Sequence, residues 1–374
     1  MFLAVRELAF ARSRYFLMGG VVALIAILMV LLSGLSVGLV NDGVSGLKQL
    51  PVTSFAFQKD VSKDSAFSRS LVDPADAKTW RDVSGVEDAA PFGNTLVNAK
   101  TDRDVDIDLA LFGVEPDSWL APEARNGATL SGPDTVLLSS TAEEEGVRVG
   151  DTITIGQLGT TVTVGGFLEG QHTFGHVDIG YLALPTWQEI RAGVRPGEQV
   201  PDHVYDEVTA IAIRADSGAD LTAAADSTGT TALTLDESFG ASPGYTAETS
   251  TLQLIQGFLY AICALVVGAF FTVITIQRRQ EIAVLRAMGA STRYLLRDTL
   301  MQSLILLVVS AGVGIGIGVA TGAAIASTPM PFALELAPIA TATLTLIVLG
   351  MIGATVAVLR ITRVDPLTAL GGNR

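Results

Sequence analysis

The sequence predicts a membrane protein with four transmembrane α-helices and an extracytoplasmic α/β domain inserted between helices 1 and 2. Three observations support this fold class. The 374 residues are 49% hydrophobic, with a mean hydropathy of +0.46, which is unusually apolar for a water-soluble protein. Four apolar runs are long enough to cross a bilayer. Charge is also divided by region, since residues 41–250 hold 13 Lys and Arg against 33 Asp and Glu, while the rest of the chain holds 11 Arg and five acidic residues.

The apolar runs predict transmembrane helices at residues 15–40, 251–276, 300–326 and 339–360. Each run has about 20 residues or more, which crosses a hydrocarbon core about 30 Å thick at about 1.5 Å per residue. A cleaved signal peptide is the alternative for the first run. That run is about twice the usual apolar length of a signal peptide, and no convincing cleavage site precedes Asn41. We therefore expect it to remain as a transmembrane helix.

Arginine predicts the orientation of these helices. Arginines lie before the first run, between the second and third runs, and after the fourth run, whereas the link between the third and fourth runs has no Lys or Arg. Positively charged loops stay in the cytoplasm. Both termini and residues 277–299 are therefore expected to face the cytoplasm, and the acidic domain of residues 41–250 to face outward.

The two ends of the chain carry further signals. Residues 1–14 mix Phe and Leu with Arg and Glu, which predicts an interfacial amphipathic helix, with a frayed tail as the alternative. Residues 361–374 form the expected cytoplasmic tail. The single cysteine, Cys263, excludes a disulfide within the chain. An acidic domain argues against nucleic acid as a partner.

The 41–250 domain is expected to be mixed α/β. β-prone runs at 136–138, 152–155, 161–164 and 210–213 lie beside Gly and Asp turns, and a short helix is expected from Ser139 to Gly146. Acids alternate with apolar residues at 102–108. A half-exposed strand explains this pattern better than a calcium loop, since an EF-hand would need glycine at 107 and glutamate at 113. His172 and His176 are expected to be solvated in a turn or loop rather than to hold a metal.

No motif indicates an enzyme. The chain has no Gly-x-x-x-x-Gly-Lys-[Ser/Thr] phosphate loop, and it shows no catalytic set and no zinc spacing, so we expect no catalytic residue, no resident metal and no intrinsic cofactor. Gly314, Gly318 and Gly322 form a stripe on the third span that permits close approach of another helix. That helix could belong to the same subunit or to a second one.

The segment between the second and third spans carries the strongest signal, RRQEIAVLRAMGAS at residues 278–291. Ile282 and Leu285 share one face of a short predicted helix, Arg279 and Arg286 mark the polar face, and Gly289 suits a C-terminal cap. Such a helix in the cytoplasm suits docking onto a soluble protein. A connector lying on the membrane surface is the alternative.

This segment resembles the corresponding signature of MacB/FtsX-type ABC permeases, as does RVDPLTAL at residues 363–370. The order of one span, an outer domain and three spans is also that of the family. The resemblance implies a homodimer of permeases, working with two copies of a separate ABC ATPase subunit that binds ATP. It also implies that the ATPase couples to the link between the spans. The expected coupling residues are Arg279, Glu281, Leu285, Arg286, Met288 and Gly289.

Within the family, MFLAVREL at residues 1–8 and the glycine-containing stretch 32–47 most resemble heme-exporter permeases. That resemblance implies efflux of heme, or of a similar amphiphile, from the lipids of the plasma membrane of a Gram-positive bacterium. The alternative is an FtsX-like permease that transports nothing and activates an extracellular cell-wall hydrolase.

If heme is the substrate, its iron needs a ligand, and the four spans contain no histidine. Glu248 lies where the second span begins and follows Tyr245 by three residues, so it is the first candidate. Apolar residues of spans one and two would enclose the ring. The expected heme-binding residues are Glu248, Tyr245, Leu252, Ile255, Leu35 and Leu39. Reserve candidates are Glu237, Phe239, Tyr260 and Met29. The alternative role for Glu248 is to complement the positive end of the helix dipole.

Overall fold

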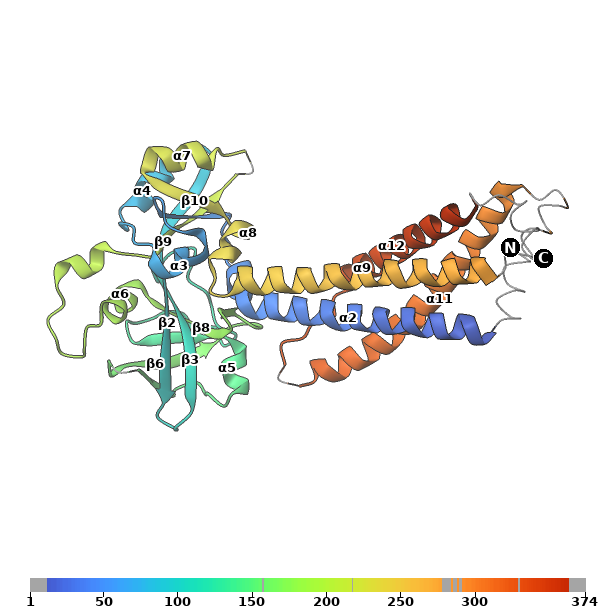
Figure 1. Ribbon diagram of the computed structural model, residues 1–374. Helices are drawn as coiled ribbons and strands as arrows, with labels where there is room; N and C mark the ends of the chain where they lie inside the picture. Colours follow the sequence, from blue (N-terminus) through green and yellow to red (C-terminus); the bar gives the residue numbers. More distant parts are fainter. Residues whose placement is uncertain are drawn as a thin grey trace. The chain divides into compact units, whose positions relative to one another are not determined.

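The computed structural model describes residues 12–156, 158–216, 218–277, 284, 288, 291–328 and 330–362. The chain divides into two compact units (Figure 1). The α/β unit comprises Leu39–Glu248. The helical unit comprises Met1–Gly38 and Thr249–Arg374.

The first half of the α/β unit is an antiparallel sheet in the order β10-β1-β9-β2. Helix α4 (Asp76–Arg81) connects β1 to β2, and helix α7 (Leu221–Thr228) connects β9 to β10, so the chain passes twice through strand, helix and strand. This is the topology of two interlocked split βαβ units. The strands are β1 (Ser54–Gln58), β2 (Val86–Thr101), β9 (Ala210–Ala215) and β10 (Thr230–Thr234). A 3₁₀ turn (Lys63–Ser65) and α3 (Ala66–Arg69) precede α4.

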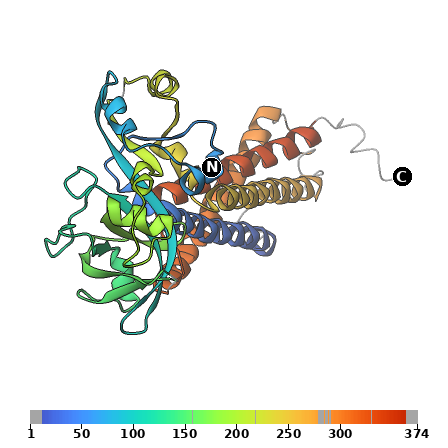
Figure 2. The same ribbon diagram turned by 90° about the vertical axis from the view of Figure 1, so that its left-hand side faces the viewer.

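The second half of the α/β unit is inserted between β2 and β9. Its strands follow the order β2-β3-β8-β4-β6-β5, and β5 pairs back onto Ala99–Thr101 of β2, which closes a ring of six strands in the described part of the unit. Figure 2 shows the two halves end-on. The added elements are β3 (Asp106–Val114), β4 (Thr135–Leu138), α5 (Ser140–Glu144), β5 (Thr152–Ile155), β6 (Thr160–Phe167), β7 (Thr173–Phe174), β8 (Val177–Ala183), α6 (Leu184–Ala192) and a 3₁₀ helix (Asp202–Asp206).

Strand β2 belongs to both halves. It pairs with β9 from Val86 to Phe92 and with β3 from Gly93 onward. Gly93 lies opposite Gly113 in this ladder, and the buried ring of Trp187 from α6 lies against both residues. A Cβ at Gly113 would come within 2.5 Å of that side chain. The glycines therefore let α6 cover the strand pair where the two halves meet.

A cluster of phenylalanine rings forms the core beside the end of α2. Phe67 lies 5.0 to 5.4 Å, centroid to centroid, from Phe55, Phe57 and Phe174, in edge-to-face geometry. This arrangement is the one that aromatic quadrupoles favour. Val44 and Leu47 from the last turns of α2 are buried in the same cluster. The β7–β8 hairpin is thus anchored in the core through Phe174.

The helical unit is built from α2 (Arg12–Lys48), α9 (Tyr245–Gln277), α11 (Thr292–Ala326) and α12 (Leu336–Thr362). Within the described residues, these four helices are long and apolar enough to cross a membrane. Each helix except α12 extends at least six residues beyond the apolar run that predicts it. The membrane boundaries themselves therefore stay predictions.

The glycine stripe of α11 packs against α2 of the same chain. The carbonyl of Ala23 and the Cβ of Ala26 lie where a side chain at Gly314 would stand, and Val30 lies against Gly318. Gly322 faces Phe332 and Leu334, which follow α11 in the chain. Of the two alternatives for this stripe, packing within the subunit is the one that the structure supports.

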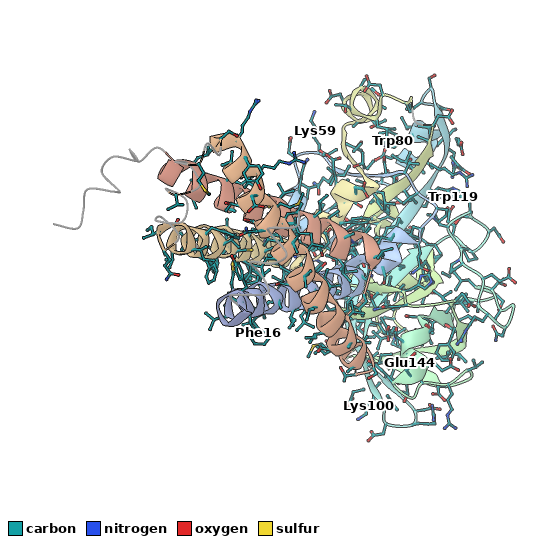
Figure 3. The ribbon with its side chains drawn as sticks, turned by 90° about the vertical axis from the view of Figure 1, so that its right-hand side faces the viewer. Phe16, Lys59, Trp80, Lys100, Trp119 and Glu144 are labelled. Atoms are coloured by element: carbon teal, nitrogen blue, oxygen red, sulfur yellow. The ribbon has the colours of Figure 1, made fainter. Side chains whose placement is uncertain are left out.

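The α/β prediction holds for the five short elements, since β4, β5, β6 and β9 cover the predicted strands and α5 lies within the predicted helix, Ser139 to Gly146. The acidic run at 102–108 is only partly a strand. Asp106 and Asp108 are exposed and Ile107 is buried on β3, as expected. Residues 102–105 instead form the turn of the β2–β3 hairpin, where Asp104 has φ 69° and pairs with Lys100 at 2.7 Å. Lys100 is labelled in Figure 3.

Candidate functional site

The start of α9 is held firmly within the α/β unit. The capped helix α8 (Leu235–Ser238) and a 3₁₀ turn (Phe239–Ala241) lead to Ser242, whose hydroxyl donates to the carbonyl of Gly43 at 3.1 Å. Gly244 then takes a left-handed conformation with φ 80°. The amide of Glu248 donates to the carbonyl of Gly244 at 3.0 Å. Glu248 therefore stands in the first turn of α9, as predicted.

The β7–β8 hairpin reaches the same place through a two-residue turn, Gly175-His176. Both residues are left-handed, with φ 60° and 67°, as a type I′ turn requires. The amide of Gly175 donates to the carbonyl of Gly43 at 2.9 Å. Left-handed backbone costs a residue with a Cβ roughly 1–2 kcal/mol. The contacts of the His176 ring with Asp42 and Glu248 offset this cost.

The ring of His176 lies between two carboxylates. Its Nδ1 is 2.8 Å from Asp42 Oδ2, and its Nε2 is 3.1 Å from both carboxylate oxygens of Glu248. Asp42 also accepts from the Gln171 amide at 3.1 Å. The side chains of Asp42, His176 and Glu248 are 23%, 30% and 38% exposed. The expectation of two solvated histidines in a turn or loop is therefore right about the backbone and wrong about both rings, since Nδ1 of His172 is also buried.

The chemistry of the three groups limits their hydrogen-bonding roles. An ionised carboxylate only accepts, so both ring nitrogens donate only when the imidazole carries both protons. The nitrogen and oxygen atoms of these three side chains form hydrogen bonds with one another. Within the described residues, no group of three or more His, Cys, Asp or Glu side chains could hold a metal ion.

The predicted heme-binding residues fall in both units. Glu248, Tyr245 and Leu39 belong to the α/β unit, and Leu35, Leu252 and Ile255 to the helical unit. Tyr245 packs on Phe239, with ring centroids 6.2 Å apart. On the surface of α9, Ile255 is 43% exposed, whereas Leu252 is only 8% exposed. Of the two apolar residues of α9 expected to bind heme, Ile255 is therefore the more exposed one.

The four reserve candidates for heme binding all have contacts within the folded chain. Glu237 forms the capping box of α8 with Thr234, and these hydrogen bonds lower the pKa of its carboxyl. Met29 is 3% exposed and packs in the core of the helical unit. Phe239 supports Tyr245, and Tyr260 packs against the helical core.

Of the predicted coupling residues, only Met288 lies among the described residues. It is 72% exposed, and its amide donates to the carbonyl of Val284 at 3.0 Å, as in a helical turn. Arg279, Glu281, Leu285, Arg286 and Gly289 lie outside the described residues.

Sequence reasoning missed Asp42 and the role of His176. Asp42 comes two residues after the predicted end of the first span, in a helix that continues to Lys48. The sequence offers one signal for His176, a Gly-His pair between two short β-prone runs, which suits a tight hairpin turn. No local pattern shows that this turn meets two helices that are about 130 and 70 residues away in the chain.

Comparisons with known proteins cover the whole chain. A family model described as a MacB-like periplasmic core domain matches residues 17–230, and one described as an FtsX-like permease C-terminal region matches residues 254–366. A protein of Staphylococcus epidermidis named as a hemin transport system permease, HrtB, is 24% identical over 375 residues, covering 100% of both chains. The protein of the same name from Staphylococcus haemolyticus is 23% identical, covering 100% of this chain and 99% of its own.

Among solved structures, the periplasmic region of MacB from Actinobacillus actinomycetemcomitans aligns with 50% of this chain and 91% of its own, at 13% identity and a TM-score of 0.35. The MacB-like core-domain model alone spans more than half of the chain. The two family models follow each other in the order expected for one span, an inserted domain and three further spans. The chain therefore belongs to the MacB/FtsX-type permeases.

Proposed function

We propose that this chain is the permease subunit of an ABC-type efflux complex that removes heme, or a similar amphiphile, from the plasma membrane of a Gram-positive bacterium. Relatives named as hemin transport permeases match its full length. The chain has no phosphate loop, so ATP is bound and hydrolysed by a separate subunit. The complex contains two permeases and two ATPases, with both permease termini in the cytoplasm.

The position of Glu248 is the observation that supports heme as the substrate. A carboxylate that is 38% exposed stands in the first turn of α9, and the residues after it form an apolar span. Heme combines a flat apolar ring with an iron that needs an axial ligand. A carboxylate is a suitable ligand for hard ferric iron. Glu248 supplies that ligand, and Tyr245, Leu252, Ile255, Leu35 and Leu39 surround the ring.

Because α9 is continuous, it can transmit the movement driven by ATP hydrolysis to this site. The helix has 33 residues without a break, from the turn that holds Glu248 to Gln277 beside the cytoplasmic link. At about 1.5 Å per residue it is about 50 Å long. Nucleotide-driven closure of the ATPases moves residues 277–299, and α9 passes this movement to Glu248 and the α/β unit. Transport is therefore mechanical.

Heme titration of the purified complex tests this function, with Glu248→Ala as the variant and Glu144→Ala, an exposed acid of the α/β unit, as the control. We expect ferric heme to change the absorption spectrum and raise the ATPase rate of the wild type and the control. In Glu248→Ala we expect binding at least about tenfold weaker, as for loss of a metal ligand or its close support. An unchanged heme spectrum and unchanged heme tolerance of cells would remove Glu248 from the site.

The FtsX-like match at residues 254–366 keeps a signal-transmitting permease as the second candidate. Such a protein would bind an extracellular cell-wall hydrolase and would not respond to heme. A complex whose ATPase rate and absorption spectrum are both insensitive to heme, and whose ATPase activates a hydrolase, would favour that function.

A further inference from the structure

The structure places the ring of His176 in contact with the carboxylate of Glu248. Its Nε2 lies 3.1 Å from both carboxylate oxygens, and Asp42 holds the opposite nitrogen at 2.8 Å. We propose that His176 is the positioning residue of the heme-binding carboxylate. It fixes the direction of Glu248 and tunes its strength as an iron ligand. This inference rests on the proposed function, because it assumes that Glu248 binds the iron.

The physical case begins with the freedom of a glutamate side chain. An exposed Glu on the first turn of a helix samples several rotamers, and ordering it costs up to about 2 kcal/mol. A ring nitrogen that is equidistant from both oxygens limits this rotation before the ligand arrives. Charge-assisted hydrogen bonds to a carboxylate are short and strong. Partners of this kind behind a metal ligand typically change metal affinity by roughly 10- to 100-fold.

The position of the ring is itself fixed by its surroundings. The Gly175 amide and the Ser242 hydroxyl both donate to the carbonyl of Gly43 on α2. The β7–β8 hairpin and the turn that precedes α9 are therefore bonded to the same oxygen atom of α2. Thr173 adds hydrogen bonds to Ser45, at 2.9 Å from its amide to the Ser45 hydroxyl. Asp42 completes the arrangement, since it sets the orientation of the imidazole. The left-handed backbone of His176 is maintained by these contacts.

The turn allows a substitution that keeps the backbone and removes the ring. Asparagine tolerates left-handed backbone better than most residues and is favoured in type I′ turns. His176→Asn should therefore preserve the hairpin while its shorter side chain leaves the two carboxylates without the bridging ring. His172→Asn is the matched control. His172 lies four residues earlier, and its Nε2 donates to the carbonyl of Glu169 at 3.1 Å rather than to Glu248.

The test measures ferric heme affinity of the permease–ATPase complex for wild type, His176→Asn, His172→Asn, Glu248→Ala and the His176→Asn/Glu248→Ala double variant. We expect His176→Asn to bind heme roughly 10- to 100-fold more weakly, with the wild-type ferric spectrum at saturation because Glu248 still ligates the iron. His172→Asn should match the wild type. The double variant should bind no more weakly than Glu248→Ala alone, since His176 acts through Glu248.

Each other outcome identifies what has failed. If Glu248→Ala weakens binding and His176→Asn does not, the positioning role is wrong and Glu248 keeps its role. If the two losses add in the double variant, or if His176→Asn alone changes the saturated spectrum, His176 binds heme directly and is not a positioning residue. If Glu248→Ala binds like the wild type, the ligand assignment in the proposed function is wrong, and the positioning role is wrong with it. An unchanged thermal midpoint of His176→Asn, followed by tryptophan fluorescence, verifies its fold.

Discussion

At the scale of single residues, Asp178 is a buried acid of the α/β unit whose carboxyl has a raised pKa. Its side chain accepts a hydrogen bond from the Thr141 hydroxyl, and the residue is 6% exposed. Burial raises the pKa of its carboxyl to about 6, and the negative charges of Glu145 and Asp42 act in the same direction. The folded state therefore holds the proton more tightly than the unfolded state does.

This pKa predicts how the stability of the α/β unit depends on pH. A raised carboxyl pKa favours the folded state below the unfolded value of about 4, and the advantage is lost as pH rises through about 6. A shift of about two units corresponds to at most about 3 kcal/mol. Asp178→Asn should remove this cost at pH 7.5 and retain an acceptor for Thr141. We expect the variant to gain about 1–2 kcal/mol at pH 7.5 and little or nothing at pH 4.5.

Tryptophan fluorescence during thermal unfolding measures this effect. Trp80, Trp119 and Trp187 are the three tryptophans of the chain, and all lie in the α/β unit. Trp80 and Trp119 are labelled in Figure 3. The signal therefore reports this unit within the full-length protein. Asp134→Asn, an exposed acid of the same unit, is the control and should change little at either pH. An equal gain for Asp178→Asn at both pH values would contradict the assignment of its pKa.

At the scale of elements, the contact of α11 with α2 depends on the absence of side chains at particular glycines. The Cβ of Ala26 would lie 2.6 Å from a Cβ at Gly314, and the backbone of Ala23 is also in contact with that position. Backbone cannot move aside as a flexible side chain can. Gly316 lies two residues away on the same helix and has nothing within 4 Å of its added Cβ. The two positions therefore separate packing from helix propensity.

We expect Gly314→Ala to weaken the helical unit and Gly316→Ala to leave it unchanged or slightly more stable. Alanine favours a helix over glycine by about 1 kcal/mol in water, and both variants gain this equally. Only Gly314→Ala must push the two helices apart, at a cost of about 1–3 kcal/mol for overpacking. The measurement is the temperature at which the detergent-solubilised protein loses its monodisperse peak in size-exclusion chromatography. Equal midpoints for the two variants would show that the stripe does not pack on α2.

At the scale of the whole molecule, the family implies a homodimer in which spans one and two line the central interface. Within one subunit, the stripe of α11 is already in contact with α2. Large apolar residues of α9 remain open on one face, with Leu254 and Phe258 both 62% exposed. These observations favour α2 and α9 over the α11 stripe as the surfaces that meet a second copy.

A disulfide between subunits tests this arrangement. The one native cysteine, Cys263, is fully buried, and Cys263→Ala provides a cysteine-free background. In that background, we expect Leu39→Cys near the outer end of the first span to form covalent dimers under mild oxidation in membranes. Val313→Cys on α11 is the control, being 54% exposed, and should stay monomeric. Dimers formed only through cysteines on α11 would contradict the predicted interface.

The sequence by itself determined the elements whose signals are local. An apolar run of about 20 residues must span a bilayer or be buried, so the four long helices follow from hydropathy alone. Strands β4, β5, β6 and β9 follow from β-branched runs bounded by glycine and aspartate. Glu248 was located because a helix begins after a Ser-Pro-Gly turn, and the family follows from the sequence motifs at residues 278–291 and 363–370.

Only the tertiary structure decided which distant residues meet. Local pattern cannot show that β5 pairs back onto β2 to close the ring, because strand pairing depends on contacts far apart in the chain. The same reason hid the ring of His176 between Asp42 and Glu248, since each of the three lies on a different element. It also left open which helix covers the glycine stripe of α11. Sequence specifies which residues can bond, and the folded backbone decides which of them come within reach.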